Sequence, residues 1–441
     1  MRNAPLWLLL TATMACTTPT APTQPQRANE IESPGAVEAK VPDDQSNDAP
    51  TKAPPAPSKP PLEPQLAADD ALVAKGEALF VEFECNRCHG GHQKIPPASR
   101  NHSCVRCHVD IGAGRAFSPA ERDALKRNVQ FSLKHVPSLL AVDQRLRRDW
   151  LEQFLLSPHK LRPMLSASMP RLNLTTDEAK ALAAYLSPQA ASPAPNAFKG
   201  DSKRGQALMD EHGCGFCHRF TAGPSIAAKA PQPPPKDIEA AMLLAPDLRW
   251  TRDRWRRDRL VAWLVDPAKL KHDTAMPGFE LTPTDAQDIA ALILTAPLGP
   301  LPKAPLPSRL ALLERRVTYE EVATRVLRQT CRHCHSAPDT AAGDGGPGNT
   351  GGFGFAGRGL NLDGYSAVAS GMVDDSGQRR SVFTPLTPGG PPYIIEALMA
   401  RHAEEAGQPV PGIRGMPLGL APLPLEDIQL LETWIAQGRP R

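Results

Sequence analysis

Eight of the nine cysteines lie in four short motifs, in each of which two cysteines are separated by two residues and followed at once by a histidine. Two thiols about one helical turn apart can add to the two vinyl groups on one edge of a haem. The adjacent histidine can then bind the iron as its proximal ligand. Zinc would need further paired cysteines or histidines and would not require a histidine after every pair. We therefore predict four covalently attached haem c groups, at CNRCH (Cys85, Cys88, His89), CVRCH (Cys104, Cys107, His108), CGFCH (Cys214, Cys217, His218) and CRHCH (Cys331, Cys334, His335).

The bulk composition fits small cofactor-filled domains. The 441 residues include 50 Lys and Arg against 47 Asp and Glu, which gives a formal net charge of only +3. A dedicated nucleic-acid binder would need a strong basic excess, so no nucleic-acid partner is expected. Hydrophobic residues make up 41% and proline is abundant, at 49 residues. The folded parts therefore have modest cores, which a buried haem would help to fill.

The N-terminus, MRNAPLWLLLTATMAC, has the shape of a signal peptide. Arg2 precedes a short apolar run, and small residues then lead to Cys16. This run is too short to span a bilayer. Cys16 directly after Ala15 predicts a lipoprotein site at the end of residues 1–16, so we expect a periplasmic protein anchored by a lipid. Ordinary signal cleavage and an uncleaved anchor remain the alternatives.

Composition also divides the rest of the chain. Residues 17–68 are rich in proline, alanine and charge, which predicts a disordered tether. Proline-rich breaks near 187–197 and at 296–308 leave three modules, at 71–187, 200–295 and 309–441. The first module contains two haem motifs, and the others contain one each. We expect the linkers to isolate the modules from one another.

The first two modules repeat each other, with Pro137 equivalent to Pro246. Each contains an amphipathic helix that ends at Ser-Pro or Asp-Pro, a loop that ends in Met-Pro, and a final capped helix. Thr175 is the expected cap in module one, and Thr282 or Thr284 in module two.

These features resemble known haem proteins. KGEALFVEFECNRCH and RGQALMDEHGCGFCH resemble the first helix and haem site of class I cytochromes c, and the Met-Pro segments resemble that family's distal-ligand loop and final helix. The third module resembles the planctomycete-type cytochrome c domain in CRHCH, GRGLNLDGYSAVASG and GMPLGLAPLPLEDIQLLETWIAQG. The resemblances imply a mainly α fold of three small helical domains in tandem, with Met169, Met276 and Met416 as distal ligands. A thioether is a soft, neutral ligand that raises the haem potential.

Module one departs from the family because it has two haem motifs and one Met-Pro segment. We assign Met169 to the CNRCH haem, so the sixth ligand of the CVRCH haem must come from elsewhere. His135 is favoured because it lies two residues before Pro137, where the chain is expected to return to the haem. The alternatives are no protein ligand or one of three other histidines: His92, His102 and His159.

Two further segments, one basic and one rich in glycine, have unusual compositions. The basic segment RWTRDRWRRDRLVAWLVDP can dock an acidic partner or neutralise haem propionates, but the interleaved aspartates favour the solvated face of a helix. The glycine-rich segment GDGGPGNTGGFGFAGRG lacks the Lys-Ser/Thr and βαβ context of a phosphate loop, so we expect a surface loop.

The leading functional prediction is a periplasmic carrier of single electrons. Its partners would be redox proteins of the cell envelope, such as a respiratory complex, a dehydrogenase or a terminal oxidase. The alternative is a haem enzyme, a dihaem peroxidase or a sulfur-compound-oxidising cytochrome, with an open iron site at the Cys104/Cys107/His108 haem. A haem-bearing subunit of a membrane dehydrogenase differs from the first class only in its partner.

Overall fold

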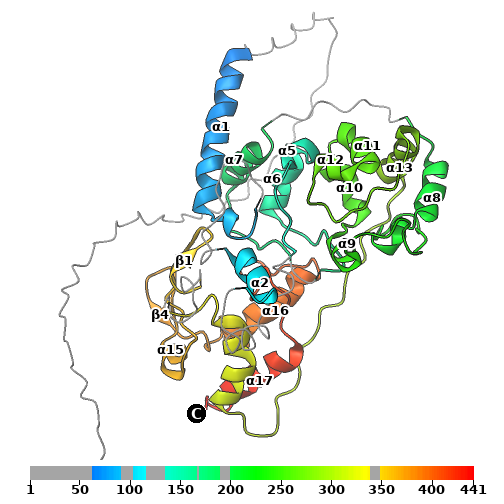
Figure 1. The fold of residues 1–441 in the computed structure, drawn as a ribbon. Coiled ribbons are helices and arrows are strands. Elements are labelled where there is room, and N and C mark those ends of the chain that lie inside the picture. The colour runs from blue at the N-terminus through cyan, green and yellow to red at the C-terminus, as the bar shows by residue number, and fades with distance from the viewer. Residues whose placement is uncertain (1–61, 91–102, 116–134, 166–167, 189–198, 338–347) are drawn as a thin grey trace, which may run out of the picture. The chain divides into compact units, whose positions relative to one another are not determined.

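A computed structural model describes residues 62–90, 103–115, 135–165, 168–188, 199–337 and 348–441. The described chain is mainly helical, as predicted, and everything from Pro60 to the C-terminus belongs to one compact unit (Figure 1). The signal segment, Cys16 and most of the predicted tether lie outside the described residues, as do His92 and His102. Among the described helices, none is long and apolar enough to cross a membrane.

Module one is built on a crossing of its first and last helices, α1 and α7 (Figure 1). The helices approach closely at Gly76, where a Cβ atom would lie 2.0 Å from the carbonyl oxygen of Ala181. Thr175 caps α7 in a capping box with Glu178, which confirms the predicted cap. Helix α1 begins within the segment predicted as a tether, because its alanine-rich sequence favours a helix. The elements are α1 (Leu62–Glu82), the 3₁₀ turn η1 (Cys85–Arg87), α2 (Cys104–Gly112), α5 (Val142–Arg145), α6 (Arg148–Leu156) and α7 (Thr176–Leu186).

Module two repeats this plan with α8 and α13. A Cβ atom at Gly205 would lie 2.1 Å from the carbonyl oxygen of Asp288, so the two helix backbones touch here as well. Thr282, rather than Thr284, caps α13 in a capping box with Asp285. The elements are α8 (Ser202–Glu211), η3 (Cys214–Phe216), α9 (Ile238–Leu244), η4 (Leu248–Trp250), α10 (Thr251–Arg254), α11 (Arg257–Val265), α12 (Pro267–Leu270) and α13 (Pro283–Thr295).

The two repeats pair with each other through the same short stretch of backbone. The N–H of Arg147 donates to the carbonyl of Arg254 at 3.0 Å, and the N–H of Arg256 donates to the carbonyl of Arg145 at 2.8 Å. Arg145 is the repeat equivalent of Arg254, and Arg147 that of Arg256. Modules one and two therefore meet as a self-complementary pair, like the subunits of a two-fold dimer.

Module three packs around Trp434, which is almost fully buried. Its haem motif begins at the last residue of a π-helical segment, η5, and two short antiparallel strand pairs lie in the chain between this segment and the last two helices. The elements are α14 (Tyr319–Val322), η5 (Ala323–Cys331), β1 (Gly351–Gly352), β2 (Phe355–Ala356), α15 (Tyr365–Ser370), β3 (Met372–Val373), β4 (Arg379–Arg380), α16 (Tyr393–Glu405) and α17 (Leu425–Ala436).

Module three also contacts module one, so the linkers do not isolate the modules. The N–H of Phe353 donates to Glu84 Oε2 at 3.1 Å, and the Arg87 guanidinium lies 5.2 Å from the centre of the Phe353 ring. The N–H of Ser168 donates to the carbonyl of Gly419 at 3.1 Å. The described part of the glycine-rich segment therefore forms a small hairpin, β1–β2, against module one rather than a simple surface loop.

Candidate haem sites

The local backbone explains how each motif presents its side chains. In three motifs the histidine N–H donates to the carbonyl of the first cysteine, at 2.8 Å for His89, 2.9 Å for His218 and 3.0 Å for His335. The CVRCH motif instead opens helix α2, whose first turn is capped by the Ser103 hydroxyl, which accepts from the N–H of Arg106. In every case a single tight turn carries both cysteines and the histidine.

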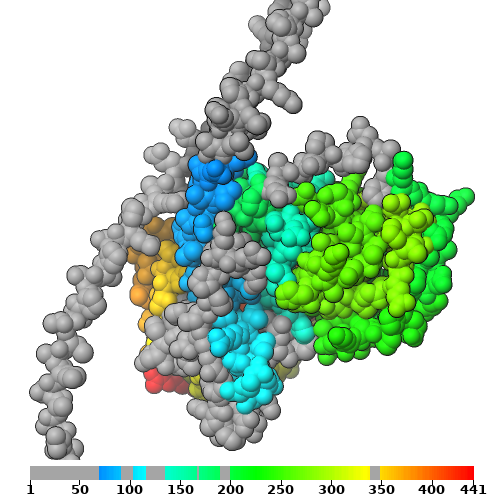
Figure 2. Space-filling view, turned by 45° about the horizontal axis from the view of Figure 1, so that its top comes forward, coloured from blue at the N-terminus to red at the C-terminus, as the bar shows by residue number. Residues whose placement is uncertain are grey.

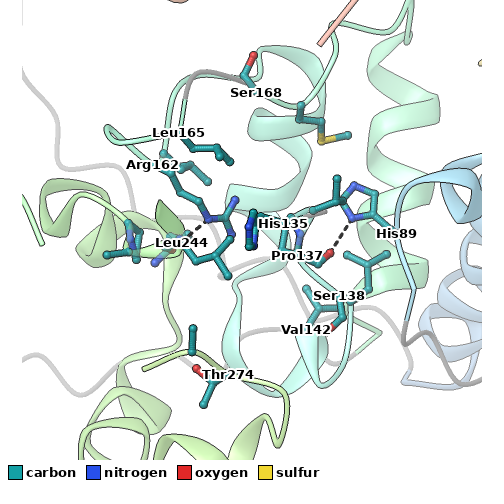
Figure 3. Close-up of a pocket in the computed structure, with 18 of the residues that line it drawn as sticks. His89, His135, Pro137, Ser138, Val142, Arg162, Leu165, Ser168, Leu244 and Thr274 are labelled. Carbon is teal, nitrogen blue, oxygen red and sulfur yellow. Dashed lines mark hydrogen bonds between the residues drawn. The ribbon is translucent and has the colours of Figure 1, made fainter. Parts of the chain in front are cut away.

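The proximal histidines of the two repeats are held by the same contact. Nδ1 of His89 lies 2.9 Å from the carbonyl oxygen of Pro137 (Figure 3). Nδ1 of His218 lies 2.8 Å from the carbonyl oxygen of Pro246. Burial lowers the pKa of both imidazoles, so each ring is neutral and Nδ1 donates its proton to the carbonyl. Nε2 then keeps a lone pair, which is the arrangement an iron ligand requires.

The other two proximal histidines are also enclosed. His108 is only 3% exposed, on the inner side of α2, although α2 itself reaches the surface in Figure 2. Burial lowers the pKa of His335. Its ring lies against Gly348, where a Cβ atom would stand 2.1 Å from Cε1. A glycine is therefore needed at position 348 for the backbone to approach this ring.

A cavity of about 550 Å³ lies at the meeting point of the first three motifs. Its wall includes His89, His108 and His218 together with Met169 and Met276. Figure 3 shows part of it, with residues from both repeats around one space. The structure thus brings together most of the predicted ligands of three haems.

The first two motifs lie directly beside each other. The thiol of Cys88 has a pKa well above its ordinary value, chiefly because it hydrogen-bonds to Cys104. Burial raises the pKa of Cys85 and of Cys214 to about 12, so these thiols stay uncharged. No group of three or more His, Cys, Asp or Glu side chains in the described ranges is arranged to hold a metal ion directly. Uncharged sulfurs in an apolar wall suit thioether bonds to a haem better than zinc thiolates.

The three predicted distal methionines occupy different surroundings. The Met276 sulfur accepts a hydrogen bond from Trp263 Nε1 at 3.1 Å. Met169 lines the shared cavity without an equivalent donor, because the repeat equivalent of Trp263 is Phe154. Met416 packs with its own module's haem cysteine, Cys331, against the core of module three.

The expectation of a solvated arginine face is wrong for two members of the basic segment. Arg254 and Arg256 are only 8% and 9% exposed, because they lie where the two repeats pair. Burial lowers the pKa of Arg254 to about 9, and those of Arg145 and Arg162 to about 10. Arginine nevertheless stays protonated in proteins, so these are buried positive charges.

The buried arginines give the cavity positive charge that a haem could pair with. Within the described part of the chain, the Nε atoms of Arg145 and Arg254 have no hydrogen-bond partner. Both side chains line the cavity, whose other walls are mostly apolar. A buried cation needs an anion beside it. A haem supplies both an apolar ring and two propionates, so the residues present fit this group.

The predicted sixth ligands of the CVRCH haem can be placed in part. His135 lines the cavity beside the Pro137 segment (Figure 3). His159 lines the same cavity, and its ring centre lies 4.2 Å from that of Trp250 across the pairing of the repeats. Lining the cavity does not distinguish these two histidines, so His135 as the sixth ligand stays a prediction.

Sequence reasoning missed Trp263 and the buried role of Arg145, Arg162 and Arg254. Comparison of the two repeats could have found part of this set, since Arg145 and Arg254 are equivalent and Trp263 replaces a phenylalanine.

Taken together, the paired helices, the Cys-x-x-Cys-His turns and the carbonyl-bound histidines define a small helical domain that binds haem through thioethers. Residues 202–297 match the family model for cytochrome c. The chain thus contains a cytochrome c domain, which supports haem-based electron transfer and implies covalently bound haem c. Searches of curated proteins and of solved structures found no match.

Proposed function

We propose that the chain is a tetrahaem c-type cytochrome that relays single electrons between redox proteins of the cell envelope. The observation that carries this proposal is the shared cavity, which gathers three Cys-x-x-Cys-His motifs from two modules. Haems held in one cavity lie close enough to exchange electrons without a mobile carrier. The haem supplies a reversible one-electron iron couple, and the chain supplies ligands, an apolar environment and charge.

The side chains around the cavity have distinct roles in this proposal. His89 and His218 present Nε2 to iron while Pro137 and Pro246 hold their other nitrogen. Met169 and Met276 provide the opposite ligands. Arg145, Arg162 and Arg254 neutralise propionates, and their positive charge favours the ferrous state.

Module three is proposed to hold the fourth haem, in a domain of the planctomycete-type cytochrome c kind. Cys331 and Met416 pack against one core cluster, which supports a single haem site there. The ring of His335, the predicted proximal ligand, packs against the backbone of Gly348.

The haem count and the potentials test the function. Protein matured by a haem c assembly system should carry four covalent haems by intact mass. A redox titration should separate a group of high-potential Met/His centres from one lower centre. Two or fewer haems would contradict the proposal. Carbon monoxide binding by the wild-type protein at the CVRCH haem would favour the enzyme alternative.

The location is proposed from the N-terminus. Cys16 follows a short apolar run, so the mature protein is expected to be a lipid-anchored periplasmic protein whose partners are respiratory complexes, dehydrogenases or terminal oxidases. Cys16→Ala should abolish incorporation of labelled palmitate and release the protein from membranes. Wild-type protein that is already unlabelled and soluble would contradict the anchor.

A further inference from the structure

Module one has two haem motifs and one predicted distal methionine, so the iron bound by His108 needs another ligand. The imidazole of His108 has a second imidazole beside it, that of His333, with 5.8 Å between the ring centres and 82° between the ring planes. His333 belongs to the fourth haem motif, CRHCH, in module three. We propose that His333 is the sixth ligand of the haem attached at Cys104 and Cys107.

The separation of the rings fits ligands on opposite faces of one haem. Two metal–nitrogen bonds of about 2 Å, together with the half-width of each imidazole, place ring centres roughly 6 Å apart. An edge-to-face contact between two aromatic rings has a similar spacing. What distinguishes this pair is that His108 is the proximal residue of a motif, and that the shared cavity lies beside both rings.

The surroundings of both histidines support this assignment. Gln329, Thr330 and Cys334 line the same cavity as Cys104 and Cys107, so this edge of module three forms part of the site. His333 is exposed, whereas His108 is buried. The ring of His333 therefore lies beside another motif's histidine at the wall of the shared cavity, where a haem attached at Cys104 and Cys107 would stand.

Independent contacts hold module three in place for this role. Phe353 binds Glu84, which directly precedes the first haem motif, and Arg401 Nη2 donates to Ser168 Oγ at 3.2 Å. Both contacts join module three to module one. The position of His333 beside module one is therefore set by contacts of the whole of module three.

Ligation by His333 would link the second haem to the fourth. His333 is the chain neighbour of Cys334, one of the cysteines of the fourth haem. Its imidazole would join the iron of the second haem to the backbone that carries the fourth. Module three would thus be connected to module one by a short bonded path, and the second haem would have two histidine ligands and the low potential that such ligation gives.

The test uses the full chain matured with its haems, because the inference rests on the proposed tetrahaem state. His333→Gly should retain four haems by mass, while one iron becomes high-spin and binds one equivalent of carbon monoxide. Free imidazole should restore the low-spin spectrum. Arg332→Gly, in the same motif, is the matched control and should leave every spectrum unchanged.

A second variant guards against loss of the fourth haem in His333→Gly. His333→Met should keep four haems and move the lowest-potential centre upward, since a thioether replaces an imidazole. If both variants carry four haems with unchanged spectra and potentials, the assignment is wrong. If His135→Gly opens the iron instead, His135 is the ligand. A wild-type count of two or fewer would overturn the proposed function first, and this inference with it.

Discussion

At the scale of single residues, the indole of Trp263 distinguishes the two repeated haem sites. Its N–H donates to the Met276 sulfur and would withdraw electron density from this predicted iron ligand. Trp263→Phe removes this bond and makes module two resemble module one, where Phe154 stands. A neutral hydrogen bond of about 0.5–1.5 kcal/mol corresponds to roughly 20–65 mV for a one-electron couple. The Met276 centre should therefore fall in potential by this order in a redox titration.

The reverse substitution provides the matched control for this residue. Phe154→Trp should raise the potential of the Met169 centre only if the indole can reach its sulfur, and it should leave the Met276 centre unchanged. If Trp263→Phe changes the potential of no centre, the hydrogen bond from Trp263 does not act on an iron-bound Met276 sulfur.

The same residues show what sequence reasoning can reach at this scale. Attachment cysteines and proximal histidines can be proposed from the sequence because a covalent attachment motif is contiguous in the chain. Trp263 and Arg254 could not, because their partners lie across a fold or a module interface. Arg254 looks like a solvated residue in its helix, since only the pairing of the repeats buries it.

At the scale of elements, the crossing of the first and last helices depends on one glycine in each repeat. In Gly205→Ala the new Cβ would stand 2.1 Å from the Asp288 carbonyl oxygen, which is backbone and cannot turn away. Alanine normally stabilises a helix interior by about 1 kcal/mol over glycine. Here overpacking should reverse the sign and cost about 1–3 kcal/mol or more. Thermal unfolding followed by circular dichroism should show a lower Tm.

Gly278→Ala is the control for this crossing, because no heavy atom lies within 4 Å of the position of its new Cβ. It should leave the unfolding temperature nearly unchanged. An unchanged Tm in Gly205→Ala would mean that the two helices can separate freely.

Helices and caps were predictable because their signals are local. Thr175 and Thr282 each stand three residues before an acidic partner, and the Pro residues mark where α6 and α11 end. The β1–β2 hairpin was not predictable, since its glycines allow many conformations and module one supplies its packing partner, Phe353 binding Glu84.

At the scale of the whole molecule, the three modules form one compact unit rather than separate domains joined by linkers. Proline-rich segments are typical of spacers, which is why the sequence favours isolated modules. The pairing of equivalent backbone segments and the docking of module three instead bring residues of the haem motifs to the wall of one cavity. Each centre should therefore respond to charges that belong to another module.

The buried arginine charge offers the clearest test of this coupling. Burial is the main cause that lowers the pKa of His218, and the positive charge of Arg254 lowers it further. Arg254 also repels Arg162 and Arg145. A positive charge disfavours ferric iron, so Arg254→Gln should lower the potential of the His218 haem by an amount on the order of tens of millivolts. The same variant should lower the potential of the His89 haem by a smaller amount, because the cavity is shared. Arg259→Gln removes an exposed arginine that pairs with Asp258 on the same helix and should change neither potential. A shift confined to the His218 haem would show that the modules titrate independently.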